Sequence, residues 1–201
     1  MTESVTVIGV GKLGLAYAAF ISSKGFKVHC IDKNDTMIAS YSRNEFNTSE
    51  PGVKDLVSKF PMTYSSDYST ILPGSVCIIL VNTPTSLSGY DHTWLEDSLA
   101  RSASGPQKCT IITSTVQPGF CDRHATPNRI YNPLFVQIGN VIDNLSSVSD
   151  VLVGGPVSVV GDFYPRIFGS DVKIHAMEYK QAEVAKLALN SFITMKISFA
   201  N

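Results

Sequence analysis

The chain has 201 residues, of which 44% are hydrophobic and 16% charged, and its formal net charge is -1 at pH 7. This length suits one full domain and the start of another, and the composition is that of an ordinary globular protein. The sequence has no excess of basic residues that would indicate nucleic-acid binding, and no apolar run approaches the roughly 20 residues of a membrane helix. The polar N-terminus does not resemble a secretory signal. A cytoplasmic protein without nucleic-acid or membrane partners is therefore expected.

The first expected strand, Val5–Val10, runs directly into a glycine-rich turn. Glycines stand at Gly9, Gly11 and Gly14, and an amphipathic helix is expected over Leu13–Ile21. In such a strand–turn–helix unit the first glycine permits a tight turn, the second lets the backbone approach a pyrophosphate, and the third lets helix and strand pack closely. The phosphates would lie on the N–H groups at the start of the helix. The alternative is the same turn in a fold that has lost its ligand.

An acidic residue follows the second expected strand. Gly25 is placed to end the first helix, and Lys27–Ile31 is a short β-forming run that delivers Asp32, 18 residues beyond Gly14. An acid near this spacing binds the adenosine ribose hydroxyls and repels the additional phosphate of NADP. The sequence therefore predicts NAD as the cofactor, although the neighbouring Lys33 weakens the selection against NADP.

Further apolar runs indicate an α/β protein. They alternate with segments that are mostly long enough for a helix, which predicts a doubly wound, mainly parallel sheet with crossover connections. One of these runs is apolar at every position, as expected of a central strand that is covered on both faces. The runs are Val76–Val81, Thr110–Ser114, Arg129–Tyr131, Val151–Val153 and Val172–Ile174.

Ligands of such sheets bind beyond the carboxyl ends of the strands. Three of the expected strands carry polar residues next to rigid turns at their carboxyl ends. Each of these segments alone is typical of an ordinary turn, but the three together favour a ligand-binding site. In sequence order they are Asn82, Thr83, Pro84 and Thr85; Ser114, Thr115, Gln117 and Pro118; and Asn132, Pro133 and Gly139.

The cysteines and histidines do not predict a metal centre. Their spacing matches no metal-binding motif, and three of the four cysteines lie in expected buried strands, where cysteine behaves as a small hydrophobic residue. Cys121 is expected to be the least buried of the four. The residues are Cys30, Cys77, Cys109, Cys121, His29, His92, His124 and His175.

The last segment, residues 178–201, contains neither glycine nor proline and is expected to form one long helix. Its pattern continues to the final residue without a stop signal, so the chain is expected to end within the helix. Residues 1–177 are assigned to the cofactor domain. Lys186 and Asn190 are four residues apart on one helix face, where they either polarise a substrate oxygen or form part of a solvated surface.

Taken together, these motifs resemble the UDP-glucose/GDP-mannose dehydrogenase family over nearly the whole chain. The segments that carry the resemblance are residues 9–15, Asp32, residues 50–52, 81–84 and 114–119, Asn132 with Pro133, Phe135 and Gly139, and residues 183–190. The family has a Rossmann-like NAD-binding domain, a long central helix at the dimer contact and a C-terminal domain that holds the sugar nucleotide. Its members oxidise a primary alcohol of the sugar to a carboxylate in two NAD-dependent steps, through a cysteine-bound intermediate.

The resemblance implies roles for some of the matching residues. Thr115, Lys186 and Asn190 are expected to be catalytic: the threonine helps to place the hydrolytic water, and the lysine and asparagine stabilise developing oxyanion charge. NAD is expected to contact a larger set, with Glu50 in a cofactor-facing loop. That set is Gly9, Gly11, Lys12, Leu13, Gly14, Asp32, Lys33, Glu50, Asn82, Thr83, Pro84, Ser114 and Thr115.

Two departures from the family pattern bear on activity. Leu134 and Ile138 stand where the family usually has glutamates, and leucine cannot transfer a proton. The family's nucleophilic cysteine belongs downstream of the long helix, and none of the four cysteines lies in its Gly-Gly-x-Cys context. We therefore expect this chain to bind NAD but not to turn over a nucleotide sugar alone.

Two alternatives remain at this stage. A 3-hydroxyacid dehydrogenase also combines a dinucleotide-binding domain with a helix that bears Lys and Asn, but the sequence has no glycine-rich substrate loop in place of Asn132 and Pro133. A non-catalytic NAD-binding module is favoured by the lost glutamates and disfavoured by Lys186 and Asn190. The apolar stripe of the last helix predicts a homodimer.

Overall fold

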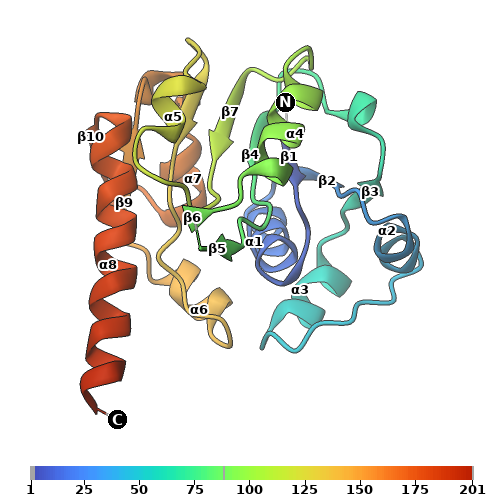
Figure 1. Ribbon diagram of the computed structural model, residues 1–201. Helices are drawn as coiled ribbons and strands as arrows, with labels where there is room; N and C mark the ends of the chain where they lie inside the picture. Colours follow the sequence, from blue (N-terminus) through green and yellow to red (C-terminus); the bar gives the residue numbers. More distant parts are fainter. Residues whose placement is uncertain (1–2, 88, 201) are drawn as a thin grey trace.

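The computed structural model describes residues 3–87 and 89–200. Helices and strands alternate along most of the described chain, and the long helix α8 follows the last strand (Figure 1). The strands are β1 (Ser4–Ile8), β2 (Lys27–Ile31), β3 (Thr63–Ser65), β4 (Val76–Ile79), β5 (Thr85–Ser86), β6 (Gly89–Tyr90), β7 (Cys109–Ile112), β8 (Arg129–Tyr131), β9 (Asp150–Gly154) and β10 (Lys173–Met177). The α-helices are α1 (Lys12–Ser23), α2 (Asp35–Ser42), α3 (Val53–Lys59), α4 (Thr93–Ser102), α5 (Phe120–Arg123), α6 (Val141–Ser146), α7 (Phe163–Phe168) and α8 (Tyr179–Ala200), with short 3-10 helices at Tyr68–Thr70 and Val157–Val160.

Within the described residues, eight strands form one sheet in the order β10-β9-β8-β7-β4-β1-β2-β3. The pairs from β3 to β8 are parallel, which confirms the expected doubly wound, mainly parallel architecture. β9 pairs antiparallel with β8, and β10 runs parallel to β9. The sequence did not predict this reversal, because the connection between β8 and β9 is long enough to carry a helix in either direction.

Each central strand contributes to two hydrophobic cores, because alternate side chains point to opposite faces. In β4, Val76 and Ile78 lie in the larger core, while Cys77 and Ile79 lie in the smaller one. The larger core also holds apolar residues of α1, α2, α3, α6 and α7, and the smaller one holds residues of α4, α5 and the start of α8. The sheet is therefore covered on both faces, as predicted for the β4 segment.

The predicted end of the first helix and the predicted second strand agree closely with the structure. The second strand has the expected bounds, and Gly25, at a φ of 87°, follows the C-terminus of α1. The sequence missed β3, which lies at the sheet edge and has no fully buried residue, and the two-residue strands of the β5–β6 hairpin. Neither segment contains the apolar run that identified the other strands.

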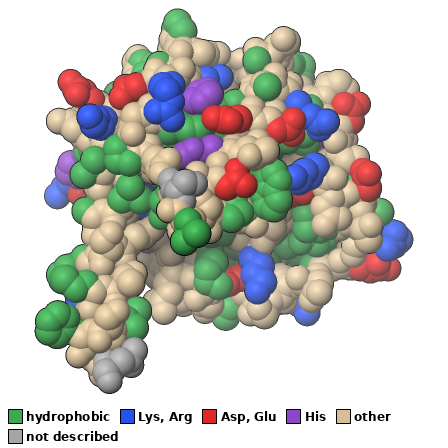
Figure 2. All heavy atoms as spheres, viewed as in Figure 1, with side chains coloured by type: hydrophobic (Ala, Val, Ile, Leu, Met, Phe, Trp, Pro, Cys, Tyr) green, Lys and Arg blue, Asp and Glu red, His purple; other side chains and the backbone are tan. Residues whose placement is uncertain are grey.

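The final helix packs against the sheet only through its first turns. Tyr179, Ala182 and Glu183 are buried, and the hydroxyl of Tyr179 donates to the carbonyl of Arg129 at 2.5 Å. Further along, apolar side chains are exposed, and this half of α8 projects from the rest of the molecule (Figure 2). The predicted helix is confirmed up to Ala200, and Asn201 lies outside the described residues. The division at residues 177 and 178 stays a prediction.

Candidate dinucleotide site

A cleft of about 730 Å³ opens at the carboxyl ends of the central strands. It lies beside β1, between its neighbours β2 and β4, where the strand order reverses direction and where open α/β sheets bind ligands. Its volume is within the range of about 300–1,000 Å³ that small-molecule sites occupy. Its lining includes Gly9, Gly11, Lys12, Leu13, Gly14, Asp32, Lys33, Asn82, Thr83, Ser114, Thr115 and Lys186.

The three glycines of the β1–α1 turn serve different purposes. Gly9 has a φ of +90°, and a Cβ there would lie 2.5 Å from the carbonyl oxygen of Leu80. A Cβ on Gly14 would lie 1.9 Å from the carbonyl oxygen of Gly9. Both positions therefore require glycine for the fold itself. Gly11 differs, because its φ of −63° suits any residue and a Cβ there would meet no atom within 4 Å.

The N-terminus of α1 offers donors to this open space. Gly11 is the N-cap residue and makes no side-chain cap, and the first turn carries no acidic residue. The first helical hydrogen bond runs from the N–H of Leu15 to the carbonyl of Gly11 at 2.9 Å, so the preceding amides have no acceptor within the helix. These amides and the positive end of the helix dipole favour an anion, without any basic side chain.

Asp32 is fixed at the edge of the cleft by two backbone amides. The N–H of Val10 donates to Oδ2 at 2.9 Å, and the N–H of Asn34 donates to Oδ1 at 3.0 Å. Each carboxylate oxygen keeps a second lone pair, so Asp32 can still accept hydrogen bonds from hydroxyl groups in the cleft. This is the arrangement that recognition of a ribose diol requires.

At the other end of the cleft, the loops after β4 and β7 are joined by two side-chain hydrogen bonds. The Thr83 hydroxyl donates to the carbonyl of Thr115, and the Ser114 hydroxyl donates to the carbonyl of Val81, both at 2.7 Å. The hydroxyl protons thus hold the two loops together, while the oxygens remain acceptors toward a ligand. Thr85, in β5, does not line this cleft.

Lys186 connects this cleft to a second cavity. Its ammonium donates to the carbonyl of Leu134 at 2.7 Å and lies 5.1 Å from the centre of the Phe135 ring. Burial lowers the pKa of Lys186, because the charged form is poorly solvated there. The second cavity, about 750 Å³ in volume, is also lined by Asn190, which does not reach the dinucleotide cleft. Thr115 and Lys186 therefore share one space, and Asn190 faces the adjoining one.

The structure places the carboxylate of Glu50, which was expected to lie in a cofactor-facing loop, inside the protein. Glu50 is 5% exposed, does not line the cleft, and accepts from the N–H of Gly139 at 2.7 Å and of Val141 at 3.5 Å. It fixes the segment that leads into α6. Pro84 also lies outside the cleft lining, and its carbonyl accepts from the N–H of Asp91 at 2.8 Å.

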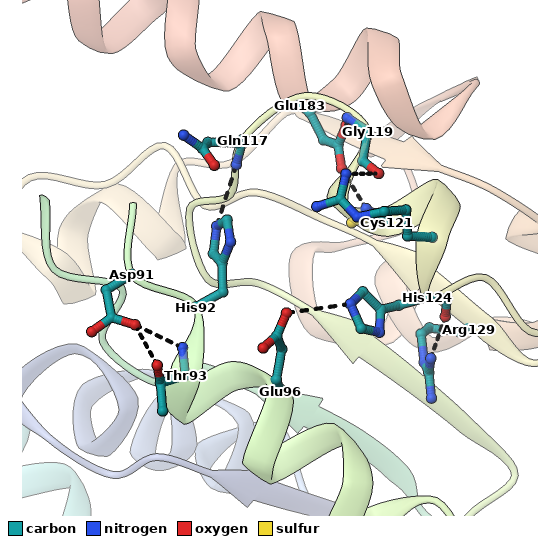
Figure 3. A network of polar contacts seen from close by, with 11 residues as sticks. Asp91, His92, Thr93, Glu96, Gln117, Gly119, Cys121, His124, Arg129 and Glu183 are labelled. Atoms are coloured by element: carbon teal, nitrogen blue, oxygen red, sulfur yellow. Dashed lines mark hydrogen bonds and ion pairs between the residues drawn. The ribbon is translucent and has the colours of Figure 1, made fainter. Parts of the chain in front are cut away.

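A second buried carboxylate, Glu183 of α8, holds the loop after β7. Its Oε2 accepts from the N–H of Gly119 at 2.5 Å and its Oε1 from the N–H of Cys121 at 2.7 Å (Figure 3). Glu183 belongs to the segment 183–190 that carries the family resemblance, but no role was predicted for it. It lies four residues after Tyr179, on the same buried side of α8.

Cys121 is fully buried, so the expectation that it is the most accessible cysteine is wrong. Burial and the neighbouring Glu183 raise the pKa of its thiol, which keeps the thiol protonated and unreactive. All four cysteines are free and buried. Among the described residues, no group of three or more His, Cys, Asp and Glu side chains is arranged to hold a metal ion.

Within residues 3–87 and 89–200, no helix combines the length and the apolar character that crossing a membrane requires.

Comparison with known proteins places this geometry in context. Residues 3–169 match the model of the UDP-glucose/GDP-mannose dehydrogenase family, NAD binding domain. The UDP-glucose 6-dehydrogenase of Pseudomonas aeruginosa is 26% identical over 97% of this chain and 49% of its own length, and UDP-glucose 6-dehydrogenase TuaD of Bacillus subtilis is 26% identical over 99% of this chain and 48% of its own. The chain thus spans about half the length of these relatives.

Solved structures show the same fold. A ternary complex of GDP-mannose dehydrogenase from Pseudomonas aeruginosa superposes with a TM-score of 0.87 at 22% identity, over 98% of this chain and 51% of that one. UDP-D-ManNAc dehydrogenase from Pyrococcus horikoshii superposes with a TM-score of 0.85 at 24% identity, over 98% and 52%.

Proposed function

Because the chain belongs to the UDP-glucose/GDP-mannose dehydrogenase family and contains its NAD-binding domain, we propose that its cleft binds NAD as the cofactor-holding part of a nucleotide-sugar dehydrogenase. The observation that carries this proposal is Gly11. The protein itself does not require glycine there, yet a side chain would project into the space in front of the free amides of α1. A bound pyrophosphate explains why that space is kept open.

The remaining contacts follow from the shape of the cleft. The pyrophosphate lies on the amides of Gly11, Lys12, Leu13 and Gly14, and the adenosine ribose donates its hydroxyls to Asp32. The nicotinamide then extends toward the other end of the cleft, where Asn82, Thr83, Ser114 and Thr115 lie. The carboxylate of Asp32 repels a 2′-phosphate, so NAD is bound in preference to NADP.

The second cavity is proposed as the sugar side of the reaction. It adjoins the cleft at Lys186 and contains Asn190, so both side chains can stabilise negative charge that develops on a substrate oxygen. NAD, when bound, accepts the hydride that leaves the alcohol carbon. Leu134 supplies a backbone carbonyl to Lys186 and no acid or base, so proton transfer needs another group.

Substrate turnover is proposed to require residues that correspond to the other half of the relatives' length. These 201 residues alone are then expected to bind NAD without forming NADH from UDP-glucose. The family match favours this assignment over a 3-hydroxyacid dehydrogenase. The non-catalytic alternative predicts the same NAD binding, and it fails if a longer protein that contains this chain reduces NAD with a nucleotide sugar.

Isothermal titration calorimetry with NAD and NADP tests the proposal. The chain should bind NAD at least tenfold more tightly than NADP, and Asp32→Asn should narrow that ratio, because a neutral amide repels the phosphate less. Asp35→Asn, in the exposed first turn of α2, is the matched control and should leave the ratio unchanged. The proposal is refuted if no binding occurs at millimolar NAD, or if both cofactors bind equally.

Self-association through α8 is proposed separately. Apolar side chains along α8 from Val184 onward are exposed, and exposed apolar surface of this kind favours a protein partner. A homodimer should appear as a concentration-dependent sedimentation coefficient, and a monomer at all concentrations would contradict it. The exposed residues are Val184, Leu189, Phe192, Ile193, Met195, Ile197 and Phe199. A cytoplasmic location stays a prediction from the sequence.

A further inference from the structure

A lysine and a tryptophan meet at the outer end of the cleft. Trp94 lies in the first turn of α4 and remains 42% exposed, and Lys33 follows directly after Asp32. The ammonium of Lys33 lies 4.0 Å from the centre of the indole ring. Both residues line the same cleft as Asp32 and the α1 amides, so the pair stands beside the proposed adenosine site rather than on an unrelated surface.

The hydrophobic core does not account for this tryptophan. Trp94 belongs to neither of the two core clusters, although it is the largest side chain type in the protein. The backbone next to it is nevertheless held at the start of α4, because Asp91 accepts hydrogen bonds from the N–H of Thr93 at 2.9 Å and from the Thr93 hydroxyl at 2.6 Å (Figure 3). An exposed aromatic ring on a fixed backbone is suited to ligand contact.

The surroundings of Trp94 suit a flat, aromatic ligand. The same end of the cleft contains Met37 of α2 and Tyr68, whose hydroxyl is 3.1 Å from that of Ser98. A thioether and aromatic rings are the groups on which nucleic-acid bases pack, because every base presents a π-face. The adenine of NAD is joined directly to the ribose that Asp32 is proposed to hold, so it must lie within this end of the cleft.

We propose that Lys33 and Trp94 form a clasp that holds the adenine base of the dinucleotide. The inference rests on the proposed NAD binding and assigns the base to two residues of this chain. It also gives Lys33 a defined position, with its ammonium over the face of the indole ring.

Trp94 is the only tryptophan in the chain, so its fluorescence reports on this end of the cleft alone. Titration with NAD or with AMP should change the emission with saturation. Nicotinamide mononucleotide, which carries no adenine, should leave it unchanged at the same concentration. This comparison needs no substitution and no enzymatic turnover.

Variants measured by calorimetry test the two residues separately. Trp94→Leu should weaken NAD and AMP binding about 5- to 150-fold, which is the range expected for loss of base stacking. Lys33→Met keeps most of the length of the side chain, removes its charge and should weaken binding about two- to fivefold. The matched control is Lys24→Met, because Lys24 also lies over an aromatic ring, that of Phe20 at 4.8 Å, but outside the cleft, and it should not change the affinity.

The outcomes separate the clasp from the function on which it rests. If NAD binds but the emission does not change and neither variant at Lys33 or Trp94 loses affinity, the clasp is wrong and the proposed function stands. If no adenine nucleotide binds to the unsubstituted chain, both are wrong. If Trp94→Leu fails to fold, the fluorescence comparison and Lys33→Met still decide the question.

Discussion

Glu183 is predicted to couple the last helix to the loop that carries Thr115. Its carboxylate is fully buried and accepts two hydrogen bonds from backbone amides, those of Gly119 and Cys121. The substitution Glu183→Gln keeps the size of the side chain but turns one acceptor into a donor. One of the two amides then faces an NH₂ group and loses its partner. Glu183→Ala removes both acceptors.

The loss of unfolding free energy can be worked out from the two hydrogen bonds that Glu183 accepts. A hydrogen bond to a charged group contributes about 1.5–3 kcal/mol, so Glu183→Gln should lower the free energy of unfolding by about 1.5–3 kcal/mol and Glu183→Ala by about 3–6 kcal/mol. For a chain of this size, each kcal/mol corresponds to a shift in melting temperature of about 2–4 °C. The glutamine variant should therefore melt roughly 3–12 °C below the unsubstituted protein.

Urea unfolding followed by circular dichroism measures these differences. The matched control is Glu178→Gln, an exposed glutamate just before the same helix, which should change the free energy by less than about 0.5 kcal/mol. A change of less than 0.5 kcal/mol for Glu183→Gln would refute the reasoning, because it would mean that the buried carboxylate does not hold the loop.

Four further substitutions test other parts of the structure. Gly11→Ala should change the free energy of unfolding by less than about 1 kcal/mol yet weaken NAD binding at least tenfold by calorimetry. Gly14→Ala should lower the free energy of unfolding in urea by about 3 kcal/mol or more, because its Cβ would lie 1.9 Å from a carbonyl oxygen. Equal effects of the two substitutions on stability would contradict this. Glu50→Gln should speed hydrogen exchange in residues 137–141, and unchanged exchange would show that the carboxylate does not fix them. Burial lowers the pKa of His29, so its neutral form, bonded to two threonine hydroxyls, stabilises the fold above about pH 6.5, and this stability is lost as the pH falls. His29→Gln should therefore flatten the dependence of the unfolding free energy on pH between about 7.5 and 5.5. An unaltered slope would argue against this role of His29.

Local patterns in the sequence were sufficient to predict the elements that bear the cleft. The glycine spacing specified a strand, a tight turn and a helix, and the contacts of Gly9 and Gly14 show why no larger residue fits there. The run Lys27–Ile31 defined the second strand and placed Asp32 beside the turn. These features depend on neighbours close in sequence, so periodicity and turn chemistry reveal them.

Features that depend on distant contacts were not predicted. Glu50 and Gly139 are 89 residues apart, and Glu183 and Gly119 are 64 residues apart, so no local pattern indicates that these carboxylates accept from backbone amides. Cys121 was expected to be the least buried cysteine from the pattern of residues around it, but it lies in the smaller core together with Tyr179 and Ala182 of α8. Trp94 was missed because a single aromatic residue near a helix start has no periodic signal.

Backbone amides at the start of α1 are proposed to hold the pyrophosphate of NAD. The most direct measurement is a ¹⁵N–¹H correlation spectrum of the chain recorded during titration with NAD. The amide signals of Gly11, Lys12, Leu13 and Gly14 should show the largest and saturable shifts. If NAD binds while these four signals stay in place and the largest shifts occur elsewhere, the claim is contradicted.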